Sequence, residues 1–316
     1  MGFVISKTFG QDVLVRPNDF NTAMHGDTVL VKITRGQAGS GRVQGEVEAV
    51  VERKQTDFPG HIEMGDGFAF FVAETARPMP DVYVSRAKLN GAADKDRVIV
   101  RITEWNKNKK PQGEVIQVLD ESDENDRVMK EILLENGFPI VFPEDVLLAS
   151  GRLPDSIPSA EIGKRKDFRN ILTFTIDPAD AKDFDDAISF RVIKDDLYEI
   201  GVHIADVSHY VQPGSILDEE AYHRATSVYL PDRVNPMLPE RISNELCSLR
   251  PNEDKLTFSA VFSISPKGEV KDYWLGRTVI HSDHRYAYED VQKIIDEKQG
   301  EYGKEILILH DLAQRF

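Results

Sequence analysis

The first 118 residues contain an internal duplication with a period of about 69 residues. Sliding the chain against itself by 69 positions, without gaps, aligns two pairs of segments, and a third pair aligns one position short of that offset. The pairs are Asp12–Val15 with Asp81–Val84, Asp27–Ile33 with Asp96–Ile102, and Gln44–Val50 with Gln112–Val118. A period this long exceeds that of solenoid repeats and indicates a small domain that occurs twice.

Each copy is a series of short β-branched or alternating runs separated by Gly, Asn, Asp and Pro. This pattern is typical of small antiparallel barrels, so we expect two of them, at residues 1–54 and 55–120. No strand before Gly2–Ile5 matches the segment that leads into the second copy. We therefore expect the first barrel to be incomplete at its N-terminus.

The second copy contains a strand-like segment, Gly65–Val72, with alternating aromatic side chains. Phe68 and Phe70 would lie on one face of this strand and Phe71 on the other. An outward pair could stack RNA bases, at about 1–3 kcal/mol per base, whereas the alternative is a place in the core. The segment resembles the RNA-stacking strand of cold-shock OB domains, which favours single-stranded RNA binding by Phe68 and Phe70.

The two halves of the chain differ in charge. A net charge of −15 argues by itself against a nucleic-acid partner. Residues 1–119, however, contain 16 Lys and Arg against 15 Asp and Glu, whereas residues 120–316 contain 23 against 39. The first half includes a basic loop that could follow phosphates, although solvation explains it equally well; its cations are Lys107, Lys109 and Lys110.

Cys247 is the single cysteine, which excludes an intramolecular disulfide and favours a reducing compartment, the cytoplasm. No base lies near it in the sequence, so we expect a small buried residue rather than a nucleophile. No apolar run approaches the roughly 18 residues that a membrane span needs, and the N-terminus lacks a signal-peptide pattern. We expect no membrane association.

From residue 121 the pattern becomes helical. Residues 121–165 predict a connector, with a helix capped at Asn125 and stopped by Gly137, and a second helix at Glu144–Ala149. Residues 166–316 mix strand-like and helical runs, which predicts an α+β domain. The strand-like runs are Leu172–Ile176, Ala187–Ile193, Tyr198–Ile204, Thr257–Ile264 and Asp272–His281, and the helical runs are Asp218–Ala225, Tyr288–Glu297 and Lys304–Phe316.

Five aspartates lie within ten positions between two of these strand-like runs: Asp177, Asp180, Asp183, Asp185 and Asp186. Pro178 ends the first run and helps to force a loop. Carboxylates this close repel one another unless a cation neutralises them. A solvated acidic turn is the alternative.

The identity of such a cation follows from its ligands. Carboxylate oxygens suit Mg²⁺, Mn²⁺ or Ca²⁺ rather than Zn²⁺. A calcium-binding EF-hand that began at Asp177 would put Ala179 and Ala181 at ligand positions, which disfavours Ca²⁺. The segment therefore predicts Mg²⁺, with Mn²⁺ as an alternative, in a phosphoryl-transfer site of the two-metal kind.

Segment Thr175–Ser189 resembles the Asp-rich signature of the ribonuclease II/R (RNB) family, and four later segments match that family in order. They are Gly201–Val211, Ser227–Pro231, Pro236–Pro239 and Leu246–Arg250. The resemblance implies two OB barrels followed by an RNB catalytic domain. It also implies a monomeric, processive 3′→5′ exoribonuclease that hydrolyses single-stranded or structured RNA, entering by its 3′ end, to nucleoside 5′-monophosphates.

Site roles are carried over from this resemblance position by position. Asp177 and Asp186 would ligate Mg²⁺, and Asp183 would support the metals or the terminal ribose. Asp185 would be the carboxylate required for the chemical step, and Asp180 lies outside the matching set. Two tyrosines would line the RNA channel: Tyr229, which would stack near the 3′ end and set the length of the final product, and Tyr288.

His203, Asp206 and His209 lie within seven positions. The two histidines have no zinc-site partner set, and the resemblance implies a strand and turn that support the acidic site. We expect structural roles for them. For Asp206, a place behind the metal ligands stays open.

The RNB domain of the family is longer than the part of this chain after residue 170. We therefore expect a fragment that lacks the later catalytic Glu and Arg segment and a basic S1 barrel, and is not a complete enzyme alone. Two rival hypotheses remain: a non-catalytic RNA-binding protein that uses the barrels, and a phosphoesterase with a non-RNA substrate.

Overall fold

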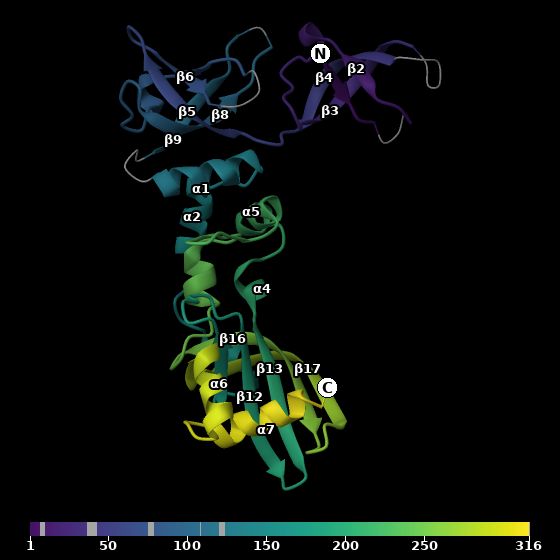
Figure 1. Ribbon diagram of the computed structural model, residues 1–316, viewed down its shortest axis with the longest axis vertical. Helices are drawn as coiled ribbons and strands as arrows, with labels where there is room; N and C mark the ends of the chain where they lie inside the picture. Colours follow the sequence, from purple (N-terminus) through teal and green to yellow (C-terminus); the bar gives the residue numbers. More distant parts are fainter. Residues whose placement is uncertain (7–9, 37–42, 75–78, 108, 120–123, 316) are drawn as a thin grey trace. The chain divides into compact units, whose positions relative to one another are not determined.

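The computed structural model describes residues 1–316 except 7–9, 37–42, 75–78, 108, 120–123 and 316. The chain forms two compact units, Met1–Val141 and Phe142–Phe316, each of which is described by itself (Figure 1). Within the described ranges, no helix is both long and apolar enough to span a membrane.

The first copy of the repeat forms an open four-stranded sheet in the order β1-β2-β4-β3. Its elements are β1 (Gly2–Val4), β2 (Val13–Val15), the short 3₁₀ helix η1 (Pro17–Asp19), β3 (Thr28–Arg35) and β4 (Val43–Glu52). Val13, Val15, Val43 and Val47 are buried between the strands. The described part of this copy thus has four strands in an open sheet rather than a closed barrel.

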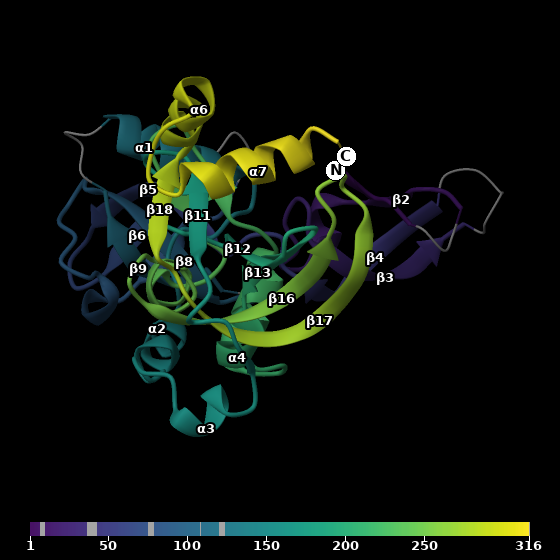
Figure 2. The same ribbon diagram turned by 90° about the horizontal axis from the view of Figure 1, so that it is seen from below.

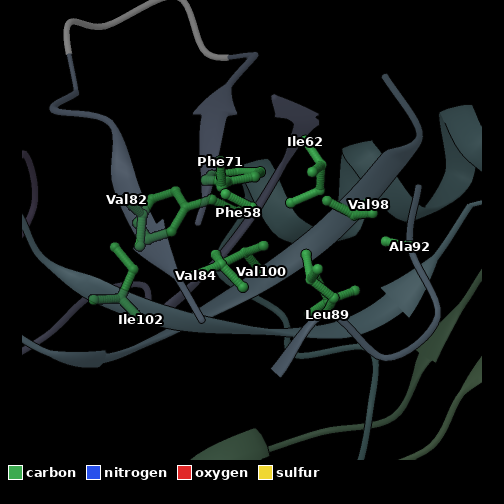
Figure 3. Close-up of a cluster of buried hydrophobic side chains, with 12 residues drawn as sticks. Phe58, Ile62, Phe71, Val82, Val84, Leu89, Ala92, Val98, Val100 and Ile102 are labelled. Carbon is green, nitrogen blue, oxygen red and sulfur yellow. The ribbon is translucent and has the colours of Figure 1, made fainter. Parts of the chain in front are cut away.

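The second copy forms a closed barrel in the order β5-β6-β7-β9-β8. Closure follows because β5 pairs with both β6 and β8, while β7 pairs in parallel with β9. The core is made of inward side chains such as Ile62, Phe71 and Val100 (Figure 3). The elements of this half are β5 (Asp57–Met64), β6 (Ala69–Ala73), β7 (Val82–Val84), η2 (Arg86–Lys88), β8 (Arg97–Glu104), β9 (Gln112–Val118) and the helix α1 (Glu124–Glu135).

The two copies repeat each other in detail. Elements β2, η1, β3 and β4 begin 69 positions before β7, η2, β8 and β9. The turn before β3 is also repeated: Asp27 Oδ2 accepts from the Met24 amide at 2.9 Å, and Asp96 Oδ2 accepts from the Ala93 amide at 2.8 Å. The duplication seen in the sequence is therefore a duplication of fold.

The second unit is α+β, as expected. Its helices are α2 (Glu144–Gly151), α3 (Ser159–Ile162), α4 (Val207–Tyr210), α5 (Ile216–Arg224), the π-helix η3 (Arg241–Leu246), α6 (Tyr288–Glu297) and α7 (Gly303–Ala313). Its strands are β10 (Lys166–Asp167), β11 (Thr173–Asp177), β12 (Asp186–Lys194), β13 (Leu197–Ala205), β14 (Val228–Tyr229), β15 (Val234–Asn235), β16 (Asp254–Ile264), β17 (Val270–His281) and β18 (His284–Ala287).

A seven-stranded sheet in the order β10-β17-β16-β13-β12-β11-β18 organises this unit. One face is covered by α6 and α7 (Figure 2). The contact includes Phe174, Phe190, Ile294 and Leu312. Alternate residues of the same strands face a second cluster, which includes side chains of α2, α5 and η3. Each face of the sheet therefore contributes buried residues, although parts of β13 and β16 stay exposed at Val202, Ile204 and Phe258.

The predicted helices and strands match observed elements within a few residues. The predicted cap of α1 is wrong, because this helix begins at Glu124 and includes Asn125. Several short elements of the second unit were not predicted: the strands β10, β14, β15 and β18, the helices α3 and α4, and the π-helix η3. Of the predicted connector, α1 belongs to the first unit and α2 to the second.

Candidate active site

The aspartates surround the loop between two paired strands. Asp177 is the last residue of β11 and Asp186 the first of β12, and the antiparallel pairing of these strands brings their ends together. Asp183 and Asp185 lie in the intervening segment, residues 178–185, which we call the carboxylate loop. Asp180 is exposed within it.

These carboxylates interact electrostatically. Asp177 is buried, at 8% exposure, and its Oδ2 has no hydrogen-bond partner among the described residues. Its pKa is raised, first by burial and also by repulsion from Asp186 and Asp183. The pKa of Asp185 is raised too, first because neighbouring protein atoms displace water and then because Asp183, Asp186 and Asp177 repel its charge. The side chain of Asp185 nevertheless reaches solvent.

This donor set suits a hard divalent cation. A buried carboxylate oxygen without a hydrogen bond and a group of mutually repelling carboxylates are both stabilised by a bound cation. As the described side chains stand, no three His, Cys, Asp or Glu residues are placed so that they could hold a metal ion. A cation would therefore have to draw the carboxylates together.

The end of the carboxylate loop is fixed by residues distant in sequence. Ser248 Oγ accepts from the Phe184 amide at 3.0 Å and donates to the Lys182 carbonyl at 3.1 Å. The Ala205 amide, at the end of β13, donates to the Asp185 carbonyl at 2.9 Å. Sequence reasoning did not find Ser248 as a site residue, although it lies in the matched segment Leu246–Arg250.

Tyr229 is next to the carboxylates. It lies in β14, is 67% exposed, and its hydroxyl donates to Asp183 Oδ2 at 3.3 Å. Partial loss of hydration, followed by the charge of Asp183, raises the pKa of Tyr229, so the phenol keeps its proton. Tyr288 directly follows Ala287, the residue paired with Asp177, and is 56% exposed. The structure thus places both tyrosines at the carboxylate end of the sheet.

The aromatic side chains beside and on β6 of the closed barrel point to the sides that the alternation predicts. Phe71 is fully buried, whereas Phe68 is 39% exposed. Phe70 stands between Phe68 and Tyr83 in edge-to-face contacts, with ring centroids 5.4 and 6.2 Å away. Tyr83 was not predicted as a site residue; it adds a third ring to this outer face.

The basic turn between β8 and β9 lies beside these rings. The Lys110 ammonium is 4.0 Å from the centroid of the Phe70 ring and 2.8 Å from Asp81 Oδ2. Lys107 and Lys109 are exposed in the same turn. The outer face of the barrel therefore combines aromatic rings with cations.

His203 is enclosed within the seven-stranded sheet. It is fully buried, and its Nδ1 and Nε2 lie 2.6 Å from Ser259 Oγ and 2.8 Å from Ser189 Oγ. Both ring nitrogens are therefore occupied by serine hydroxyls. Burial lowers the pKa of His203 to about 4, so the ring is neutral at physiological pH.

This buried imidazole predicts a dependence of stability on pH. The unfolded chain takes up a proton at His203 near pH 6.5, whereas the folded protein does so only near pH 4. Stability is therefore full above pH 6.5 and falls by on the order of 3 kcal/mol as the pH drops to 4. Denaturant unfolding measured across this range should show a clearly smaller loss in His203→Gln than in the wild type. Equal losses of stability in the variant and the wild type would show that His203 does not cause this pH dependence.

Asp206 is one partner of an internal ion pair, and His209 lies beside the same group of charges. Asp206 Oδ2 lies 2.7 Å from the Arg165 guanidinium, and both side chains are almost fully buried. Glu161 contacts the same guanidinium at 2.9 Å, and His209 lies 3.7 Å from Glu161.

Cys247 is buried as well, which raises the pKa of its thiol to about 12, so it is not an activated nucleophile.

Fold and site together define a class: OB-type β-domains joined to an α+β domain that has a cluster of acidic residues at one end of its sheet. Three known domain families match the sequence of this chain. They are the RNB domain at residues 165–316, the cold shock domain at 70–143 and the ribonuclease B OB domain at 1–50. Together with the relatives below, these matches show that the chain belongs to the ribonuclease II/R (RNB) family.

Among curated relatives, ribonuclease R of Thermotoga maritima is 38% identical over 94% of this chain and 42% of that protein. Ribonuclease R of Acidithiobacillus ferrooxidans is 34% identical over 93% of this chain and 67% of that sequence. The chain spans less than half the length of the first relatives it matches.

Solved structures agree in fold. RNase R of Mycoplasma genitalium in complex with ribose-methylated single-stranded RNA matches with a TM-score of 0.70 and 27% identity, over 99% of this chain and 49% of that one. The same enzyme in complex with double-stranded RNA matches over 82% of this chain, with a TM-score of 0.61.

Proposed function

We propose that the full-length protein is a Mg²⁺-dependent, processive 3′→5′ exoribonuclease that hydrolyses RNA to nucleoside 5′-monophosphates. The observation that carries this proposal is the juxtaposition of four carboxylates with the exposed Tyr229 ring. The carboxylates suit metal-assisted phosphodiester hydrolysis, and the Tyr229 ring suits the stacking of a nucleotide beside them. The ribonuclease R relatives support the same conclusion.

In this proposal, Asp177 and Asp186 hold the cation or cations, with Asp183 as a further ligand or as the partner of the terminal ribose. When bound, Mg²⁺ would activate water and stabilise charge on the leaving oxygen; Mn²⁺ could replace it. Asp177 contributes its unpaired buried oxygen. Asp185, exposed beside its three neighbours, is the carboxylate of the chemical step.

Single-stranded RNA is the proposed partner, entering by its 3′ end. Tyr229 and Tyr288 would contact the terminal nucleotides. On the closed barrel, Phe68 and Phe70 would stack bases, and the nearby lysines Lys107, Lys109 and Lys110 would neutralise phosphates. The proposed protein is a monomer. Its proposed location is the cytoplasm, because the single buried Cys247 suits a reducing compartment.

The test uses the full-length protein with RNA labelled at its 5′ end. In Mg²⁺, we expect a ladder that shortens from the 3′ end, released nucleoside 5′-monophosphates, and complete arrest by EDTA. Tight RNA binding without degradation in either Mg²⁺ or Mn²⁺ would instead support the rival hypothesis of a non-catalytic RNA-binding protein.

Replacement of Tyr229 tests the stacking role. Tyr229→Ala should lengthen the final undegraded product by several nucleotides, because a base would lose a stacking surface of about 1–3 kcal/mol beside the carboxylates. Tyr229→Phe should retain the short product, since it keeps the ring. The limit product is read on a sequencing gel, with Tyr222→Ala, a substitution of an exposed tyrosine of α5, as the matched control. A ladder unchanged by Tyr229→Ala would remove Tyr229 from the channel.

A further inference from the structure

The two ends of the carboxylate loop have different anchors. Its second half is fixed by Ser248 and the Ala205 amide, as described above. Its first half begins with Pro178, which has no amide hydrogen to donate to a neighbouring strand. Within the loop, the Ala181 amide donates to the Pro178 carbonyl at 3.1 Å, which makes a single turn. A turn of this size needs further support to hold one position.

Arg285 supplies that support. It lies in β18, where it pairs in register with Thr175 of β11. Its Nη2 donates to the Pro178 carbonyl at 2.7 Å and to the Ala179 carbonyl at 2.9 Å. Its guanidinium also lies 5.4 Å from the centroid of the buried Phe184 ring, at the other end of the same loop. One side chain therefore contacts both halves of the carboxylate loop.

We propose that Arg285 is the positioning residue of the carboxylate loop, and that it fixes the backbone beside Asp177 so that the carboxylates can close around a divalent cation. This inference rests on the proposed metal-dependent function. The planar guanidinium suits the role, because its rigid plane fixes the direction of both hydrogen bonds from Nη2, whereas an ammonium is a point donor on a flexible stem.

The positive charge of Arg285 and its contacts with the loop backbone have opposite effects on metal binding. The Arg285 cation repels a nearby metal ion, so an electrostatic effect alone would make its removal strengthen metal binding. The loss of backbone support would weaken metal binding, as it does for the residues that orient metal ligands, by about 10- to 100-fold.

The experiment titrates MnCl₂ into the full-length protein and follows free Mn²⁺ by electron paramagnetic resonance. Arg285→Met should weaken Mn²⁺ binding at least 10-fold, and Arg285→Lys should recover part of that loss because its ammonium reaches one carbonyl. Arg191→Met is the matched control, since Arg191 lies on β12 and pairs with Glu199 away from the loop. The Mg²⁺ concentration for half-maximal RNA degradation should shift in the same order.

Unchanged or tighter Mn²⁺ binding in Arg285→Met would overturn the positioning role. Failure of the proposed function gives a different result: wild-type protein that binds Mn²⁺ through Asp177 and Asp186 but leaves RNA intact. In that case the Mn²⁺ titration of the Arg285 variants still decides the positioning role.

Discussion

Asp185→Asn should reduce RNA degradation by the full-length protein by on the order of 10³-fold or more, while single-stranded RNA binding persists. The substitution keeps the size of the side chain but removes the negative charge, so the amide cannot replace the carboxylate in the chemical step. Asp185 is exposed, and its backbone carbonyl remains bonded to the Ala205 amide in the variant. We therefore expect a folded protein that has lost its chemistry.

The assay compares single-turnover degradation rates in saturating Mg²⁺ with RNA affinity measured by fluorescence anisotropy. Asp180→Asn is the matched control, because Asp180 is an exposed aspartate of the same loop outside the proposed ligand set. Its rate should stay within a few-fold of the wild type. Comparable rates in Asp185→Asn and the wild type would show that the assignment of Asp185 is wrong.

Asp206→Ala should destabilise the second unit by about 3 kcal/mol. Removal of one partner from a buried ion pair leaves the other charge without compensation, which costs about 3–5 kcal/mol. The Arg165 side chain is fully buried, so water cannot replace the lost carboxylate. We expect the lower end of this range because Glu161 still pairs with Arg165.

The two tryptophans allow this effect to be assigned. Trp105 lies in the first unit and Trp274 in the second, so a Trp105→Phe background leaves fluorescence that reports on the second unit. Urea unfolding of Asp206→Ala in this background gives the change in free energy, and Asp195→Ala, in the exposed turn between β12 and β13, is the control. A loss below about 1 kcal/mol would mean that Asp206 is not an essential partner of Arg165.

The sequence predicted most elements of the fold because they depend on local patterns. The matched segments placed β2, β3 and β4 against β7, β8 and β9, and the structure confirms the repeat to the level of the Asp27 and Asp96 turns. Alternation assigned Phe71 inward, as observed. Strand β18 was missed because four residues between a long strand and a helix give too short a pattern to read.

For the candidate site, the sequence by itself determined which carboxylates gather, since Asp177 and Asp186 are the adjoining ends of two strands joined by one short loop. Only the tertiary structure decided what surrounds them. Tyr229, Ser248 and Arg285 contact residues that are 46, 64 and 107 positions away along the chain. Such contacts depend on the order of strands in the sheet, where β18 pairs beside β11, and no local period in the sequence encodes that order.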